Sequence, residues 1–174
     1  MNLKQNYFEL FGVPQEFDVD LDALEKRYLE LQREVHPDRF AAAPKAEQRL
    51  SMQLATRVNE AYETLKYPLE RAEYLLRLSG VDPELETNTA MPPEFLSAQL
   101  ERREALEAAV AAGDWERLIA LSSDLGVEED ALLGTIGRQL DAKNWVDAAA
   151  LLRQLKFLEK FSEEIDSAEE GMET

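Results

Sequence analysis

The sequence reads LQREVHPDRF from residue 31 to residue 40, and this stretch ends one amphipathic helical pattern before the next begins. Upstream of His36, apolar residues recur at alternating spacings of three and four, which is typical of one face of an α-helix. These residues are Leu21, Leu24, Tyr28, Leu31 and Val35. Asp20 is the expected N-cap of this helix. Because Pro37 disfavours the α region for the residue before it, the helix should end at His36.

A second long helix is expected after a loop over residues 39–44. Its apolar stripe consists of Leu50, Leu54, Val58, Ala61 and Leu65, and the pair Tyr67-Pro68 interrupts it. Two long helices joined by a short loop pack antiparallel. The sequence therefore predicts a helical hairpin with His36-Pro37-Asp38 at its tip.

Short helices are expected on both sides of the hairpin. The first follows Asn6, an N-cap residue with Glu9 three positions on, and Gly12 closes it. The other covers residues 69–78 and stops near Gly80. The first 75 residues thus read as one helical domain.

The second half of the chain predicts a three-helix bundle. Residues 80–93 contain three prolines and no helical period, so we expect a linker there. Helical patterns then begin near Pro93, Asp114 and Asn144. The glycines of the middle pattern leave its continuity open; they are Gly126, Gly134 and Gly137.

No segment shows a strand pattern, so the expected fold class is all-α. The expected domains are an N-terminal domain over residues 1–75 and a three-helix bundle over residues 94–174. Residues 76–93 would hold the end of a connecting helix and the linker. The first domain consists of the antiparallel hairpin and its short flanking helices.

Charge and composition exclude several classes of function. The net charge is −17, with 10 Lys/Arg against 14 Asp/Glu in residues 1–74 and 9 against 22 in residues 75–174. Such a chain is repelled by nucleic-acid phosphates and by anionic membranes, so neither is an expected partner. The absence of cysteine excludes disulfides, thiolate zinc sites and any iron–sulfur cluster held by this chain's own thiolates. No basic leader or long apolar run is present, which favours the cytoplasm.

The only histidine, His36, offers little for catalysis. Taken with Asp38 it suggests a general base and its orienting acid, as in an acidic helical hydrolase. However, no serine or cysteine nucleophile motif accompanies the pair, no second histidine completes a metal site, and no glycine-rich phosphate loop occurs. We therefore expect no enzymatic activity, no cofactor and no bound metal.

Four stretches carry a resemblance to a known family: YFELFG at 7–12, LQREVHPDRF at 31–40, NEAYETL at 59–65 and PLERAEYLL at 68–76. With these motifs the chain resembles the HscB family of J-domain co-chaperones of iron–sulfur cluster assembly, over nearly its whole length. The N-terminal domain would then be a J-domain. The missing Gly/Phe-rich linker and cysteines argue against the alternative, a general J-domain co-chaperone with other clients.

The resemblance implies an ATPase partner for the hairpin. His36, Pro37 and Asp38 would dock on a DnaK-type chaperone, HscA in this family, and stimulate its ATP hydrolysis. The basic residues Lys26, Arg27 and Arg33 would supply positive contacts to an acidic partner surface. In the alternative reading these three residues are merely solvated and paired with Glu25, Glu30 and Glu34.

The bundle carries an apolar face with acidic neighbours. At about 100° per residue, the core stripe of its first helix consists of Phe95, Gln99, Arg102, Leu106, Ala109 and Val110. Leu96 and Leu100 fall outside that stripe, beside Glu101 and Glu104, and Phe157 lies off the apolar cluster of the last helix. An apolar patch rimmed by acids suits a partner with an apolar centre and a basic edge.

In the family that the chain resembles, the corresponding face binds the scaffold protein IscU. The resemblance assigns this role to Leu96, Leu100, Glu101, Glu104 and Phe157. Ser97 and Ala108 replace the methionine and the acidic residue expected there, which would weaken or shift the footprint. Alternatively, the apolar residues of this patch simply pack against neighbouring helices or the N-terminal domain.

Overall fold

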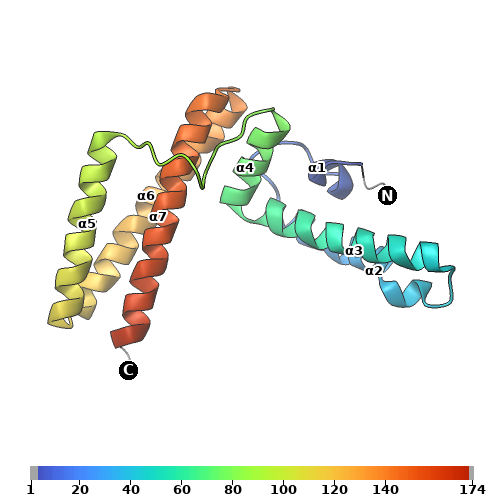
Figure 1. Cartoon of the computed structure of the whole chain (residues 1–174), viewed down its shortest axis with the longest axis horizontal. Helices are drawn as coiled ribbons and strands as arrows, with labels where there is room; N and C mark the ends of the chain where they lie inside the picture. The colour runs from blue at the N-terminus through green and yellow to red at the C-terminus, as the bar shows by residue number, and fades with distance from the viewer. Residues whose placement is uncertain (1–3, 173–174) are drawn as a thin grey trace. The chain divides into compact units, whose positions relative to one another are not determined.

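The computed structural model describes residues 4–172, and every regular element in that range is helical (Figure 1). This confirms the all-α prediction. By its contacts the chain divides into two compact units, Met1–Leu75 and Leu76–Thr174. None of the helices between residues 4 and 172 is both long enough and apolar enough to cross a bilayer.

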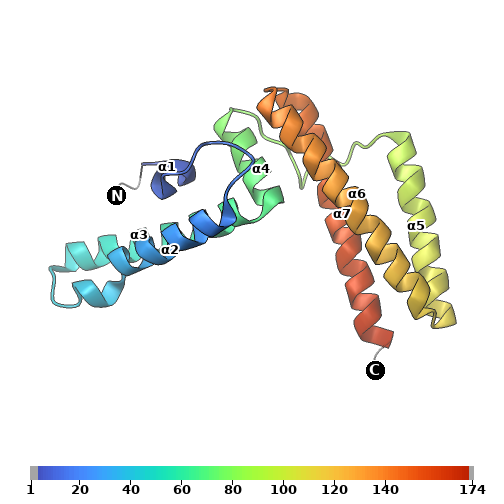
Figure 2. The ribbon, with the colours of Figure 1, turned by 180° about the vertical axis from the view of Figure 1, so that it is seen from behind.

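The first unit is built on an antiparallel hairpin of α2 (Leu21–Val35) and α3 (Lys45–Lys66), which lie side by side in Figures 1 and 2. Asp20 caps α2 as expected, because its Oδ1 accepts the N–H of Ala23 at 3.0 Å. His36 ends the helix with φ −56° and ψ 127°, the extended conformation that a following proline requires.

The connection between α2 and α3 is tighter than expected. Pro37–Phe40 forms a turn of 3₁₀ helix, η1, so the irregular part of the loop is shorter than residues 39–44. A proline suits the first position of such a turn because it has no N–H to satisfy. The tip of the hairpin is therefore an ordered turn that begins directly after His36.

The flanking helices form as the sequence predicts. In α1 (Tyr7–Phe11), Asn6 Oδ1 accepts the Glu9 N–H at 2.8 Å while Glu9 Oε2 accepts the Asn6 N–H at 2.9 Å. Gly12 closes the helix with φ 68°, a left-handed conformation that glycine adopts without strain. The second flanking helix is α4 (Pro68–Leu78).

α4 contacts both α1 and the C-terminal end of α3. The Tyr74 ring stacks on Tyr7 at 4.5 Å, and its hydroxyl accepts the Tyr7 N–H at 3.0 Å. The Arg71 guanidinium, only 6% exposed, donates from Nη1 to the carbonyls of Leu65 at 2.6 Å and Lys66 at 3.3 Å. These carbonyls belong to the last turn of α3, which has no further helical N–H to bind them.

One position of the predicted α3 stripe is wrong. Leu50 is 46% exposed, whereas its neighbour Ser51 is only 3% exposed. Ser51 continues the alternating spacing back from Leu54 and Val58, so it occupies the inward position by geometry. The apolar character of Leu50 favours it for the core, but the helix phase places Ser51 against α2.

The second unit contains α5 (Pro93–Ala112), α6 (Trp115–Asp141) and α7 (Trp145–Met172). The glycines of the second unit do not break α6, and α7 continues through the acidic residues of positions 163–170 to Met172. One cluster of its core comprises Leu106, Ala109, Leu118, Leu125, Leu158, Phe161 and Ile165. The α5 stripe is confirmed for Gln99, Leu106 and Ala109, which are buried, but Val110 is 42% exposed and lies outside the core.

The linker is attached to α7 within the second unit. Arg153 Nη1 donates to the Pro83 carbonyl at 3.1 Å, and Lys160 pairs with Glu86 at 3.9 Å. Pro83 itself is buried. The segment before α5 therefore follows a defined path to the start of that helix (Figure 2).

Candidate functional site

The tip of the hairpin presents an exposed imidazole and an exposed carboxylate. The side chains of His36 and Asp38 are 58% and 90% exposed. Nδ1 of His36 accepts the N–H of Asp38 at 3.3 Å and lies 3.6 Å from its Oδ2. Because Nδ1 acts as an acceptor, the neutral ring carries its proton on Nε2, which leaves that N–H available to a partner.

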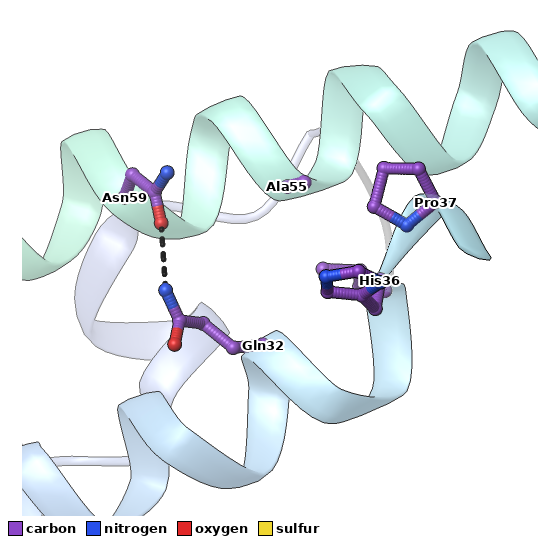
Figure 3. Close-up of a pocket in the computed structure, with 6 residues that line it drawn as sticks. Gln32, His36, Pro37, Ala55 and Asn59 are labelled. Atoms are coloured by element: carbon purple, nitrogen blue, oxygen red, sulfur yellow. Dashed lines mark hydrogen bonds between the residues drawn. The ribbon is translucent and has the colours of Figure 1, made fainter. Parts of the chain in front are cut away.

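Two open hollows flank the His36 ring. One, of about 310 Å³, is lined by Gln32, Val35, His36, Pro37, Ala55 and Asn59 (Figure 3). The other, of about 420 Å³, is lined by Leu29, Gln32, Arg33, His36 and Arg39. Neither is an enclosed reaction chamber, and both are shaped by the end of α2. The tip is thus suited to contact another surface.

The three basic residues of α2 differ in their surroundings. Nη1 of Arg27 pairs with Glu30 at 3.1 Å and with Glu34 at 3.5 Å. Lys26 and Arg33 are exposed and form no ion pair with any residue from 4 to 172. The alternative of intrahelical pairing therefore holds for Arg27, whereas the charges of Lys26 and Arg33 remain uncompensated.

The predicted patch of the second unit lies on the surface of α5. Leu96 and Leu100 are 48% and 62% exposed, so neighbouring helices do not cover them. Glu101 and Glu104 are also exposed, and neither pairs with a cation within the part of the chain that the structure describes. The structure therefore presents two leucines and two free carboxylates along α5.

Phe157 has a different environment from the leucines. It is half-buried, and its ring meets Phe95 edge to face, with centroids 5.8 Å apart and planes at 79°. This contact brings α7 beside the first turn of α5. Phe157 thus supports the helix that carries the leucines, while Ser97 and Ala108 lie exposed on that helix.

Polar side chains underlie part of α5. Gln99 is 7% exposed, and neither of its amide atoms has a hydrogen-bond partner in the described range 4–172, while Arg102 pairs with Glu128 of α6. Burial raises the pKa of Glu129, and the neighbouring charges of Asp130, Asp166 and Glu128 raise it further. The Arg102–Glu128 pair thus places two charged groups between α5 and α6.

Three residues at the hairpin tip were not predicted from the sequence. Leu29 is 46% exposed beside His36, Ser51 donates to the Val35 carbonyl, and Gln48 donates to the carbonyls of Ala41 and Ala43. For Ser51 a signal existed, since the alternating spacing of the α3 stripe passes through it. The other two depend on where the loop places its carbonyls and side chains.

Comparisons with known proteins cover both units. Residues 6–74 match the DnaJ domain family, and residues 91–166 match the family described as HSCB C-terminal oligomerisation domain. A relative from Aromatoleum aromaticum, named Co-chaperone protein HscB homolog, is 49% identical over 175 residues, covering 100% of this chain and 99% of its own length.

Solved structures show the same likeness. Chaperone HscB from Vibrio cholerae superposes with a TM-score of 0.87 at 38% identity, covering 97% of this chain and 99% of that one. The human co-chaperone protein HscB gives a TM-score of 0.88 at 29% identity, with 95% and 83% covered. The match extends over both units of the chain.

Proposed function

This chain belongs to the HscB family of J-domain co-chaperones, and from that membership we propose that it stimulates the ATPase of a DnaK-type chaperone, HscA, and delivers the scaffold protein IscU to it. It would act as an adaptor in iron–sulfur cluster assembly, in the cytoplasm and without enzymatic activity of its own. The observation that carries the proposal is the exposed His36-Pro37-Asp38 turn at the hairpin tip.

The chemistry of the tip supports docking on an acidic surface. His36 offers an N–H donor, and the charges of Lys26 and Arg33 have no ion-pair partner among residues 4–172. Their attraction to an acidic patch speeds encounter even though the whole chain is negative. Arg27 would contribute less, because docking must first compete with Glu30 and Glu34.

The first test measures steady-state ATP hydrolysis by the chaperone as this protein is titrated. We expect stimulation that saturates, and a double variant, Lys26→Gln with Arg33→Gln, should need a roughly tenfold higher concentration for half-maximal effect at low salt. The difference should shrink as salt screens the exposed charges. An unchanged half-saturating concentration at low salt would contradict a role for these cations.

A matched control removes two charges from the other unit. Arg117 and Lys143 are exposed on the second unit, so Arg117→Gln with Lys143→Gln changes the net charge equally. This control should leave stimulation within twofold of the wild type. If the wild type itself fails to stimulate ATP hydrolysis, the proposed function is wrong.

The α5 patch supports the second half of the proposal. Leu96 and Leu100 offer apolar area at the surface, and Glu101 and Glu104 offer free carboxylates beside it. A scaffold surface with an apolar centre and basic edge would bury the leucines and pair with the carboxylates. Phe157 would contribute through its contact with Phe95.

Leu96→Ala with Leu100→Ala should weaken scaffold binding roughly thirtyfold. Truncating each half-exposed leucine removes about 1 kcal/mol of binding free energy that its burial by the scaffold would supply. About 1.4 kcal/mol corresponds to a tenfold change in the dissociation constant. Isothermal titration calorimetry with the purified scaffold measures the change. The fold should be unaffected because alanine is a good helix former and neither side chain belongs to the core.

The control for the patch is another exposed apolar pair of the same unit. Ile119 and Val127 on α6 are 60% and 69% exposed, so Ile119→Ala with Val127→Ala removes comparable surface. An equal loss of scaffold affinity in the two double variants would show that the effect is not specific to α5. Chaperone stimulation without any scaffold binding would instead favour the alternative function, in which this HscB-family protein presents other clients to the chaperone.

A further inference from the structure

The last carbonyls of α2 are bound by side chains that come from outside the helix. Nη1 of Arg39 donates to the carbonyls of Arg33 at 3.0 Å and Glu34 at 3.3 Å. Oγ of Ser51 donates to the carbonyl of Val35 at 2.7 Å. A helix C-terminus leaves such carbonyls without intrahelical partners, so each donor here fixes a peptide group close to His36.

Of these donors, Ser51 is the buried one. It is 3% exposed, and it reaches from α3 to the residue immediately before His36. A buried carbonyl without a donor pays the full cost of its desolvation, so the Val35 carbonyl strongly favours the orientation in which it accepts from Ser51. The plane of the Val35–His36 peptide is thereby tied to α3.

The same face of α3 shapes the hollow around the His36 ring. Ser51, Ala55 and Asn59 follow one another at intervals of four, so they line one side of the helix. Figure 3 shows Ala55 and Asn59 on α3 across from Gln32 and His36. Ala55 ends at Cβ, and this leaves space beside the imidazole.

Asn59 anchors the far side of this hollow. Its Oδ1 accepts from Gln32 Nε2 at 3.4 Å and from the Tyr28 hydroxyl at 3.1 Å. The Tyr28 ring stacks on Tyr62 of α3, with centroids 4.0 Å apart and planes at 9°. The spacing of α2 and α3 next to the tip is therefore held by side chains on both helices.

We propose that Ser51 is a positioning residue for His36, which fixes the imidazole in its docking orientation through the Val35 carbonyl; this rests on the proposed function of the tip. Three constraints act in sequence on the backbone that carries the ring. Ser51 holds the Val35 carbonyl, Pro37 has a fixed φ, and Nδ1 of His36 accepts the N–H of Asp38. An imidazole that is already oriented loses less entropy when a partner binds it.

Because His36 is the only histidine, its ring gives the only imidazole signals in a ¹H–¹⁵N spectrum. The wild type should show an unprotonated Nδ1 and a protonated Nε2 at a pH where the ring is neutral. In Ser51→Ala the ring should sample several orientations, and its Nδ1 signal should shift or broaden. Unchanged ring signals in a folded Ser51→Ala protein would overturn the proposal.

The functional readout separates positioning from simple loss of stability. If only a fraction of Ser51→Ala molecules holds the ring in its docking orientation, the half-saturating concentration for ATPase stimulation should rise about three- to tenfold. Maximal stimulation at saturation should stay at the wild-type level. A lower melting temperature with an unchanged half-saturating concentration would show a purely structural serine and overturn the proposal.

Two further variants keep the test decisive. Ser51→Thr retains the hydroxyl and should restore both the ring signals and the half-saturating concentration. If Ser51→Ala does not fold, Ser51→Cys preserves the volume with a weak donor and should shift both readouts in the same direction. Wild-type behaviour of a folded Ser51→Cys protein would then count against the proposal.

Ser167→Ala is the matched control. Its hydroxyl also donates to a carbonyl, that of Glu163 at 2.8 Å, but it belongs to the second unit. This variant should leave the His36 signals unchanged. Since the ring signals are recorded without any partner, they decide the positioning role even if the wild type fails to stimulate the chaperone.

Discussion

Replacing His36 with Gln should reduce stimulation of the chaperone ATPase by at least roughly thirtyfold at subsaturating concentration. A central contact of a docking surface contributes about 2 kcal/mol or more, which corresponds to that factor. Gln retains hydrogen-bonding groups but lacks the ring that lines both hollows at the tip. The measurement is steady-state ATP hydrolysis across a titration of the variant.

The fold should tolerate this change. The His36 side chain is 58% exposed, and its one hydrogen bond within residues 4–172 is accepted from the neighbouring Asp38 N–H. Helical circular dichroism and scaffold binding should therefore equal those of the wild type. Glu60→Gln, at an exposed position of α3, is the control and should stimulate normally. Full stimulation by the His36→Gln protein would remove the tip from the proposed mechanism.

Arg71→Met should destabilise the first unit by about 2–3 kcal/mol. Methionine retains a long, unbranched apolar side chain like the aliphatic part of arginine. It leaves the Leu65 and Lys66 carbonyls at the end of α3 without their donor. Hydrogen bonds to a charged group contribute about 1.5–3 kcal/mol each. Burial lowers the pKa of Arg71, and the charge of Asp18 opposes this shift. Because Met carries no charge that must be desolvated, the substitution recovers part of the stability that the lost hydrogen bonds cost.

Urea unfolding can follow the two units separately. All five tyrosines lie in residues 1–75 and both tryptophans in residues 76–174. The midpoint reported by tyrosine near-ultraviolet circular dichroism should fall by about 1–2 M, given typical denaturant dependences for small domains. The midpoint reported by tryptophan fluorescence should not move. Arg49→Met, a change of the same type at an exposed position of α3 in the first unit, is the control and should leave both midpoints unchanged.

An unchanged tyrosine midpoint in Arg71→Met would mean that other groups satisfy the end of α3. The contact of the Arg71 guanidinium with the Phe17 ring, 5.1 Å from the centroid, gives a second check. Phe17→Leu should destabilise the same unit by less, because it removes the cation–π contact but leaves both hydrogen bonds.

Local features of the fold could be predicted because they depend on residues a few positions apart. The Asn6 capping box, the Asp20 cap and the helix end before Pro37 each follow from short-range sterics and hydrogen bonding. The exposed face of α5 with Leu96 and Leu100 likewise follows from helical spacing. These features are all visible along a single helix.

Features that join separate helices could not be predicted in the same way. Hydrophobicity alone predicts Leu50 in the core, whereas the packing of α3 against α2 buries Ser51 and leaves Leu50 exposed. It assigned Phe157 to the exposed patch, whereas the contact with Phe95 half-buries it. The hydrogen bonds of Arg71 to the end of α3 could not be predicted either, because they depend on how α4 packs against that helix.

The sequence alone determined the elements of this protein: where helices begin and end, that His36-Pro37-Asp38 lies between two of them, and which face of α5 is apolar with acidic neighbours. Capping, proline sterics and helical spacing act over a few residues, so they can be predicted from the sequence. The tertiary structure decided how the His36 turn is held, which cations of α2 remain unpaired, and where Phe157 packs. Those outcomes depend on distances between atoms far apart in sequence, which arise only when the helices pack together.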